Sequence, residues 1–106
     1  MQQPEENLPE LRTDEKHLLE KGREHFEARR AFVVSAPKDH KHIPALRRLG
    51  ELICGGSGSD VLLRSVIDPF RIGDTLMLWA LAKEKHQYAV EFHEGSEGVV
   101  IRFSPR

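Results

Sequence analysis

The stretch that decides the fold lies near the C-terminus, at residues 88–103, and reads YAVEFHEGSEGVVIRF. Large apolar residues occupy every second position on both sides of a glycine-containing turn: Tyr88, Val90, Phe92, Val99, Ile101 and Phe103. Successive side chains of a strand point to opposite faces, so this alternation predicts two strands that each bury one face. Because the turn Gly95-Ser96-Glu97-Gly98 is short, the two strands should pair as a hairpin.

Four further elements are expected between residue 31 and this hairpin. Residues 31–35 are β-branched and aromatic and predict a strand, while residues 61–67 form an apolar run typical of an interior strand with a parallel partner. Helices are expected at residues 44–54 and 74–86, the second one burying Trp79. The predicted fold class is therefore α+β, a β-α-β-α-β-β two-layer sandwich with an extra N-terminal helix.

The N-terminal third of the chain is expected to contribute that extra helix. Residues 1–12 hold two prolines and scattered charge and are interpreted as a flexible tail. Residues 13–30 predict an amphipathic helix, with Thr13 as its N-cap and with Leu18, Gly22 and Phe26 on one face. This helix either packs on the domain's own sheet or docks on a partner, and residues 31–106 are expected to form the α+β domain.

Composition limits the classes of function. Sixteen Lys and Arg residues against seventeen Asp and Glu residues give a net charge of −1, which offers no overall attraction to nucleic acid or anionic lipid. No apolar run is long enough to span a bilayer, and the charged N-terminus does not resemble a signal peptide. A single cysteine excludes an internal disulfide and a cysteine-based zinc cluster. We therefore expect a small soluble cytoplasmic protein that needs no cofactor, of unknown oligomeric state.

Five short motifs recur in the order known from one bacterial family: Ile43-Pro44, Asp68-Pro69, Trp79, Lys85-His86 and Val100-Ile101-Arg102. In this order and spacing the chain resembles the TusA/SirA-like sulfur carriers over about residues 31–104. In that family a Cys-Pro pair opens the first helix, a strand ends in Asp-Pro, and a Trp-bearing helix ends in Gly-His before a hairpin. The resemblance implies the β-α-β-α-β-β fold and a docking surface.

The chain departs from that family at the residue that carries its chemistry. Ile43 stands where the family has the sulfur-binding cysteine, and an aliphatic side chain forms neither a thiolate nor a persulfide. Cys54 lies at the opposite end of the same predicted helix, where the helix dipole disfavours a thiolate. The leading hypothesis is therefore a non-catalytic protein-binding or regulatory module. A sulfur carrier or transferase acting through Cys54 is one alternative.

The expected binding surface joins two loops, residues 38–44 and 68–72, at one end of the sheet. Its candidate residues are His40, His42, Ile43, Pro44, Arg47, Asp68, Phe70 and Arg71. Loops at one end of a sheet commonly carry function, and Ile43 and Phe70 would be unusual apolar residues to leave exposed there. A protein partner is favoured over nucleic acid.

Two other kinds of site remain open at this surface. His40 and His42 form a His-x-His pair that binds a metal only if a third ligand, such as His93 or Asp68, lies nearby. The element order also resembles the C-terminal domain of bacterial translation initiation factor three, which binds ribosomal RNA. An RNA site would use basic and aromatic side chains from both loops and the following helix: Lys41, Arg47, Arg48, Arg71 and Phe70.

Overall fold

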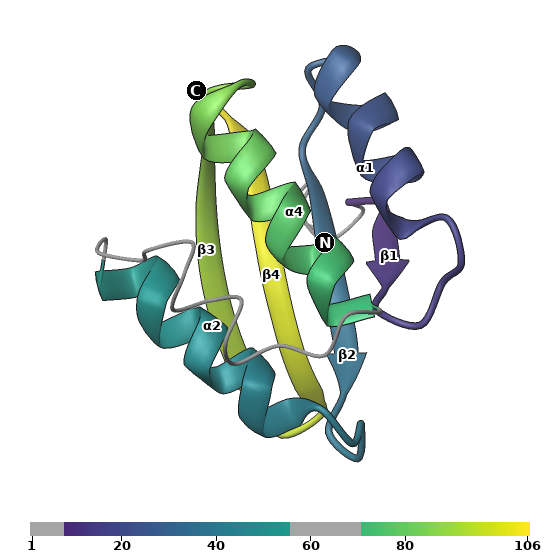
Figure 1. Cartoon of the computed structure of the whole chain (residues 1–106), viewed down its shortest axis with the longest axis vertical. Coiled ribbons are helices and arrows are strands. Elements are labelled where there is room, and N and C mark those ends of the chain that lie inside the picture. The colour runs from purple at the N-terminus through teal and green to yellow at the C-terminus, as the bar shows by residue number, and fades with distance from the viewer. Residues whose placement is uncertain (1–7, 56–70) are drawn as a thin grey trace, which may run out of the picture.

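The computed structural model describes residues 8–55 and 71–106, which form a four-stranded sheet and three helices. The expected strand at residues 61–67 lies outside the described residues. Figure 1 shows the arrangement of the elements. In chain order they are β1 (Glu10–Arg12), α1 (Leu18–Glu27), β2 (Phe32–Pro37), α2 (Ile43–Gly55), α4 (Arg71–Glu84), β3 (Tyr88–Gly95) and β4 (Gly98–Pro105). The α+β fold class is confirmed.

The sheet has the strand order β1-β2-β4-β3. β3 and β4 are antiparallel with Phe92 opposite Ile101, which confirms the predicted hairpin. β4 also pairs with β2 in the antiparallel sense, with Val34 opposite Ile101. β1 pairs with β2 in parallel, with Leu11 opposite Val34. The central strand β2 therefore has one neighbour from each end of the chain.

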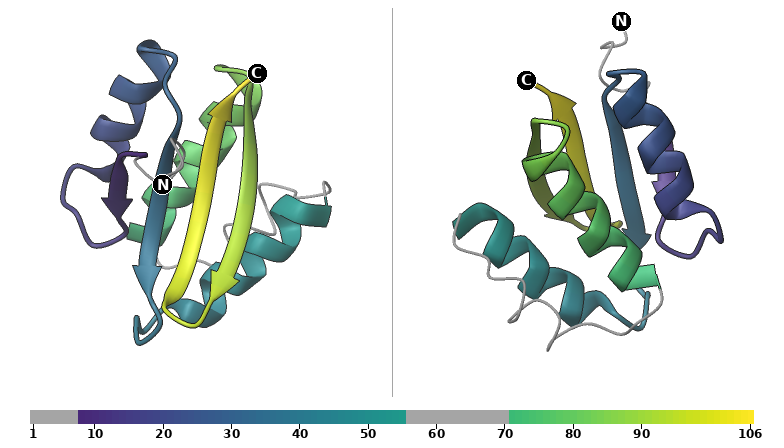
Figure 2. Two further views of the ribbon diagram at one scale, coloured as in Figure 1. Left: turned by 180° about the vertical axis from the view of Figure 1, so that it is seen from behind. Right: turned by 45° about the horizontal axis from the view of Figure 1, so that its top comes forward.

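The three helices lie on one face of the sheet, as Figure 2 shows from two further directions. The burial of β2 follows this arrangement, because Phe32, Val34 and Ala36 are buried while Val33 and Ser35, which point the other way, are only partly covered. Among the described residues the molecule therefore has two layers, and the sheet face opposite the helices is not covered by a helix.

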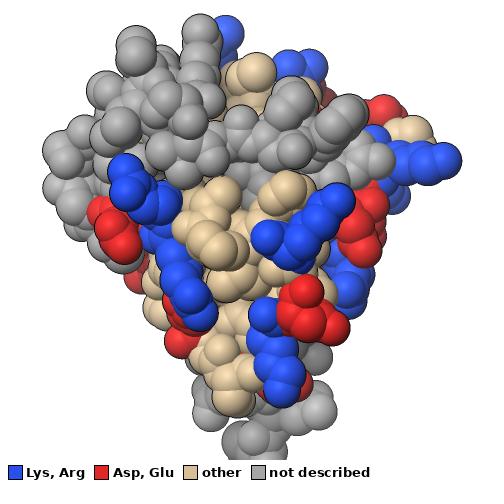
Figure 3. All heavy atoms as spheres, turned by 60° about the horizontal axis from the view of Figure 1, so that its bottom comes forward, with Lys and Arg blue, Asp and Glu red and all other residues tan. Residues whose placement is uncertain are grey.

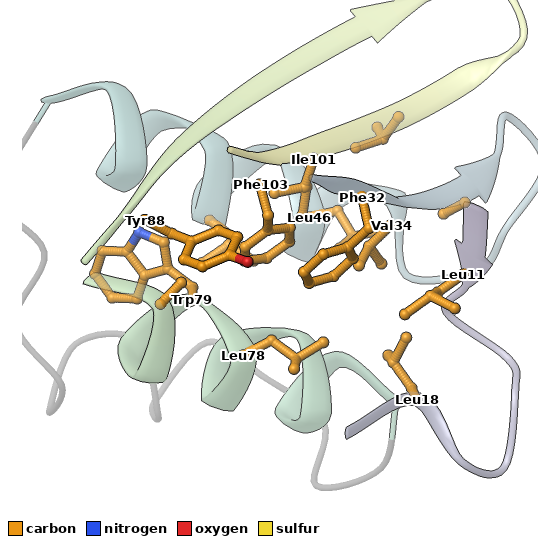
Figure 4. Close-up of a cluster of buried hydrophobic side chains, with 14 of the residues drawn as sticks. Leu11, Leu18, Phe32, Val34, Leu46, Leu78, Trp79, Tyr88, Ile101 and Phe103 are labelled. Atoms are coloured by element: carbon orange, nitrogen blue, oxygen red, sulfur yellow. The ribbon is translucent and has the colours of Figure 1, made fainter. Parts of the chain in front are cut away.

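Between the two layers lies a core rich in aromatic side chains (Figure 4). The rings of Phe32 and Phe103 stack with their centroids 4.6 Å apart, and Phe26 from α1 meets Tyr88 edge to face at 4.9 Å. Trp79 is 5% exposed, which confirms its prediction as a core residue, and its indole N–H has no hydrogen-bond partner among the described residues. The aromatic residues join α1, the hairpin and α4 into one core.

The end of α1 is tied to the hairpin through Tyr88. Its hydroxyl oxygen lies 2.8 Å from the carbonyl oxygen of Arg30 and 3.1 Å from that of His25, so the O–H donates to one of the two carbonyls. The imidazole of His25 stacks on Phe32 at 5.0 Å, and its Nδ1 atom is buried with no hydrogen-bond partner in residues 8–55 and 71–106. Burial lowers the pKa of His25 below its ordinary value of 6.5, and the neighbouring Arg30 lowers it further.

Two glycines allow the helices to approach their neighbours closely. A Cβ atom at Gly22 would fall inside the van der Waals radius of the Leu78 side chain, and one at Gly50 would fall inside that of the Phe92 ring. Gly22 therefore sets the packing of α1 on α4, and Gly50 sets that of α2 on β3. Leu18, Gly22 and Phe26 are all buried, as the amphipathic pattern predicts. The helix thus packs on its own domain.

Two expectations for the N-terminal region are wrong. Residues 10–12 belong to the sheet as β1, so the tail predicted for residues 1–12 does not extend that far. The helix begins at Leu18 instead of Thr13, because the Thr13 amide N–H donates to the Ser35 carbonyl at 2.9 Å and continues the β1 pairing. Since β1 and β2 are parallel, α1 is the crossover between them. The structure therefore offers no boundary between α1 and the rest of the domain.

Candidate functional site

The loop at residues 38–42 connects β2 to α2 at one end of the sheet, and its backbone is held at several points. The amide of Lys38 donates to the carbonyl of Glu97 in the hairpin turn at 3.0 Å. The amide of His40 donates to Pro37 at 3.0 Å, and that of Ile43 to His40 at 3.1 Å. These hydrogen bonds fix the loop against the hairpin and lead directly into the first turn of α2.

His40 completes the start of α2 with its side chain. Its Nδ1 atom accepts the amide N–H of His42 at 3.1 Å, which satisfies one of the backbone donors that a helix start leaves open. The ring centroids of the two histidines are 5.5 Å apart. Burial lowers the pKa of His40 below 6.5, and the nearby His42 lowers it further. Both effects favour the neutral imidazole, the form in which Nδ1 can accept a hydrogen bond.

This arrangement gives no support to a metal site. Within residues 8–55 and 71–106, no group of three or more His, Cys, Asp or Glu side chains could hold a metal ion. Because His40 uses Nδ1 to accept a backbone N–H, that atom is not available as a ligand. Asp68, one of the two third ligands considered from the sequence, lies outside the described residues.

The first turn of α2 divides its residues between the core and the surface. Ile43 is 6% exposed and belongs to the hydrophobic core, so the expectation that it lies on an exposed apolar surface is wrong. Pro44 is exposed at the second residue of α2, where its missing N–H costs nothing. Ile43 thus anchors the helix start, and Pro44 presents an apolar ring to solvent.

A shallow depression of about 460 Å³ lies beside this turn, lined by Lys41, His42, Pro44, Ala45 and Arg48. Lys41 and Arg48 are exposed, and neither forms an ion pair with another described side chain. Their charges therefore stand beside an apolar surface made by Pro44 and Ala45. The sequence did not single out Ala45, because an alanine in a helical pattern carries no signal of exposure.

Arg47 is placed differently from its two basic neighbours. Its Nε atom donates to Glu94 Oε2 on β3 at 2.7 Å, a contact that ties α2 to the edge of the sheet. This pairing places a carboxylate beside the exposed Arg47, so its charge is partly balanced within the chain. Figure 3 views the molecule from this end of the sheet and shows acidic and basic side chains interspersed around an uncharged centre. The surface is therefore of mixed charge.

The second loop of the expected site, at residues 68–72, lies mostly outside the described residues. Asp68 and Phe70 lie outside the described residues, and Arg71 is described only as the first residue of α4. Cys54 is the penultimate residue of α2, at the C-terminal end whose carbonyl groups disfavour a thiolate. The structure thus brings together His40, His42, Pro44 and Lys41 with Arg48, while Arg47 faces the hairpin.

Comparison with protein-family models, with curated proteins and with solved structures finds no match to this chain. In the described part of the chain no helix is long and apolar enough to cross a membrane. The site must therefore be interpreted from its own geometry, which offers an apolar, positively charged depression on a rigid helix start.

Proposed function

We propose that this protein is a non-catalytic protein-binding module with a TusA-like layout, which binds an acidic segment of a partner at the depression beside the first turn of α2. The observation that carries the proposal is the position of Lys41 and Arg48, which form no ion pair with another described side chain, beside the apolar surface of Pro44 and Ala45. Acidic side chains would neutralise the two cations, and an apolar side chain would cover the proline. The neutral His40 supports the site by holding the loop in place.

Rigidity of the site favours binding over catalysis. Its backbone is fixed by hydrogen bonds to the hairpin turn and within the loop, so little conformational entropy would be lost when a partner docks. Lys41 and Arg48 are both exposed, so an acidic segment of a partner can reach them. The missing cysteine at position 43 supports the same conclusion, because Ile43 is a core residue with no reactive group.

Affinity capture with charge-reversed variants tests the proposal. The double variant Lys41→Glu, Arg48→Glu should lose the proteins that wild type retains from a lysate, because both cations become repulsive to an acidic segment. The matched control, Lys21→Glu with Arg23→Glu, reverses two exposed cations on α1 and should retain them. Retention of the same proteins by the first variant and wild type would place the binding site elsewhere.

Two additional treatments separate the other functions. Nuclease treatment of the lysate removes partners held through RNA, and their loss would favour the RNA-binding function. Incubation with cysteine and a cysteine desulfurase, followed by intact-mass measurement, tests Cys54, and the mass of one added sulfur atom would favour the carrier function. We expect neither change, because Arg47 is paired with Glu94 and Cys54 stands at the unfavourable end of α2.

A further inference from the structure

The sheet face opposite the helices carries two rows of side chains that cross all four strands. The register places Glu10, Val33, Arg102 and Glu91 side by side, and we call these the first row. Two residues further along the strands, Arg12, Ser35, Val100 and His93 form the second row. Since side chains two positions apart share a face, both rows point away from the helices. The left view of Figure 2 shows this face of the sheet toward the viewer, with the helices behind the sheet.

The charges of the two rows lie at the edges of the sheet, with a mostly uncharged centre. On β1 the first row has Glu10 and the second has Arg12, and both are exposed. On β3 the first row has Glu91 and the second has His93, both also exposed. Between them Val33, Ser35, Val100 and Arg102 are partly covered, and Arg102 is the one charged side chain of this centre. Each edge of the face therefore has an acidic position next to a basic one. On β3 the two already lie together, with His93 Nε2 3.7 Å from Glu91 Oε1, and the basic position is charged only when His93 is protonated.

We infer that this face binds the same face of a second copy of the chain, about a two-fold axis that runs across the strands between the two rows. This axis keeps each strand opposite itself and exchanges the rows, so that Glu10 faces Arg12 of the second copy and Glu91 faces His93 of the second copy. The symmetry makes each of these contacts twice. In the centre, Val33 faces Ser35 of the second copy and Arg102 faces Val100 of the second copy. No like charges therefore lie opposite each other.

The alternative axis is unfavourable, which fixes the orientation of the two copies. An axis parallel to the strands would place β1 over β3 of the second copy. Glu10 would then face Glu91, two like charges that repel each other. Two sheets that pack face to face keep their strands within about 30° of each other, so a crosswise arrangement is not required. Charge complementarity thus selects one two-fold arrangement.

The size of the face predicts that the association is weak. Strands of 3, 6, 8 and 8 residues, about 4.8 Å apart and rising about 3.4 Å per residue, give a footprint of roughly 400 Å². A standard stable interface buries about 800 Å² on each partner. We therefore expect a dissociation constant of about 10 µM to 1 mM, since small polar interfaces lie at the weak end of the range. Added salt should weaken the dimer further, because its specific contacts are between exposed charges.

The test exchanges the two charges of β1 within one chain. Sedimentation velocity then measures the dimerisation of each variant at protein concentrations up to about 1 mM, the weakest dissociation constant expected above. Glu10→Arg alone and Arg12→Glu alone each turn two attractive contacts into repulsive ones and should weaken dimerisation by about tenfold or more. The double variant Glu10→Arg, Arg12→Glu exchanges the two charges and restores complementarity, so it should dimerise like wild type. Lys21→Glu, on the exposed side of α1, is the matched control and should not change the equilibrium.

Two results would overturn the inference. One is a wild-type protein that stays monomeric across the whole series at low salt, and the other is a pair of single variants that dimerise as strongly as wild type. Circular dichroism of each variant shows whether β1 still folds into the sheet. If a β1 variant unfolds, Glu91→Lys on β3 supplies the same measurement, and undiminished dimerisation of that variant would equally exclude this face.

Discussion

Replacement of Gly22 by alanine sets two opposing effects against each other. Alanine is the better helix former, and in an exposed helix interior the change stabilises by about 1 kcal/mol. In this structure, however, the new Cβ atom would overlap the side chain of Leu78, which is 0% exposed and has no room to move into solvent. Overpacking of a filled core costs about 1 to 3 kcal/mol. Gly22→Ala should therefore reduce the free energy of unfolding by up to about 2 kcal/mol net, and should not increase it.

Urea denaturation of a double-mutant cycle isolates the packing effect. Leu78→Ala alone should cost about 2 to 5 kcal/mol, because it removes a fully buried side chain. In that background the space beside Gly22 is open, so Gly22→Ala should become neutral or stabilising, with a coupling of about 1 to 3 kcal/mol. Gly95→Ala is the matched control, since a Cβ atom there meets nothing within 4 Å. If Gly22→Ala stabilises the wild type by about 1 kcal/mol, helix propensity decides the outcome and α1 does not pack closely on α4.

Three further predictions concern the core and its pH dependence. Trp79→Ala should cost about 3 to 5 kcal/mol in chemical denaturation, and a loss under about 1 kcal/mol would show that the indole is exposed. Tyr88→Phe removes the hydroxyl that donates to the end of α1 and should cost about 1 to 1.5 kcal/mol; an unchanged denaturation midpoint would mean that the hydrogen bond is replaced by water. Because burial lowers the pKa of His25 and His40 below 6.5, the unfolded state binds protons that the folded state does not. The free energy of unfolding should thus be constant well above pH 6.5 and decrease as the pH falls below it, and His25→Phe should reduce this slope.

The parts of the fold that the sequence predicts well are those with a clear period. The alternation of residues 88–103 reports a strand pair directly, and Val99, Ile101 and Phe103 are all buried as expected. The predicted helix at residues 44–54 corresponds to α2, and the one at residues 74–86 to α4, which begins at Arg71. In each case the same signal extends over more than ten residues.

The short strand β1 carries no such signal. A segment of three residues, Glu10-Leu11-Arg12, holds a single apolar side chain, which is too little for a periodic pattern. Its place in the sheet depends on the pairing with β2, which the local sequence does not contain. The predicted start of α1 is wrong for the same reason. Thr13 is a good N-cap by residue type, but its amide N–H is paired with the sheet.

The candidate site shows where sequence reasoning about exposure fails. Ile43 at the end of a polar loop suggested an exposed apolar residue, yet α2 begins there and turns its side chain into the core. Arg47 and Arg48 are adjacent and identical in type, but of the two only Arg47 reaches a carboxylate of the described residues, that of Glu94, which lies 47 residues further along the chain. A distinction of this kind depends on which side of the helix faces β3, and that requires the packing of Gly50 against Phe92.

The position of β2 between β1 and β4 has a consequence for how the chain is made. During synthesis β2 leaves the ribosome when β1 and its crossover helix are the described elements already available, since β4 (Gly98–Pro105) emerges after the other described strands. Until then the edge of β2 that pairs with β4 has no partner strand, and the Phe32 ring lacks its stacking contact with Phe103. Pairing across some 65 residues is also intrinsically slow, because the long loop must close before any of its contacts form. The nascent chain is therefore most exposed to aggregation just before its C-terminal hairpin is complete.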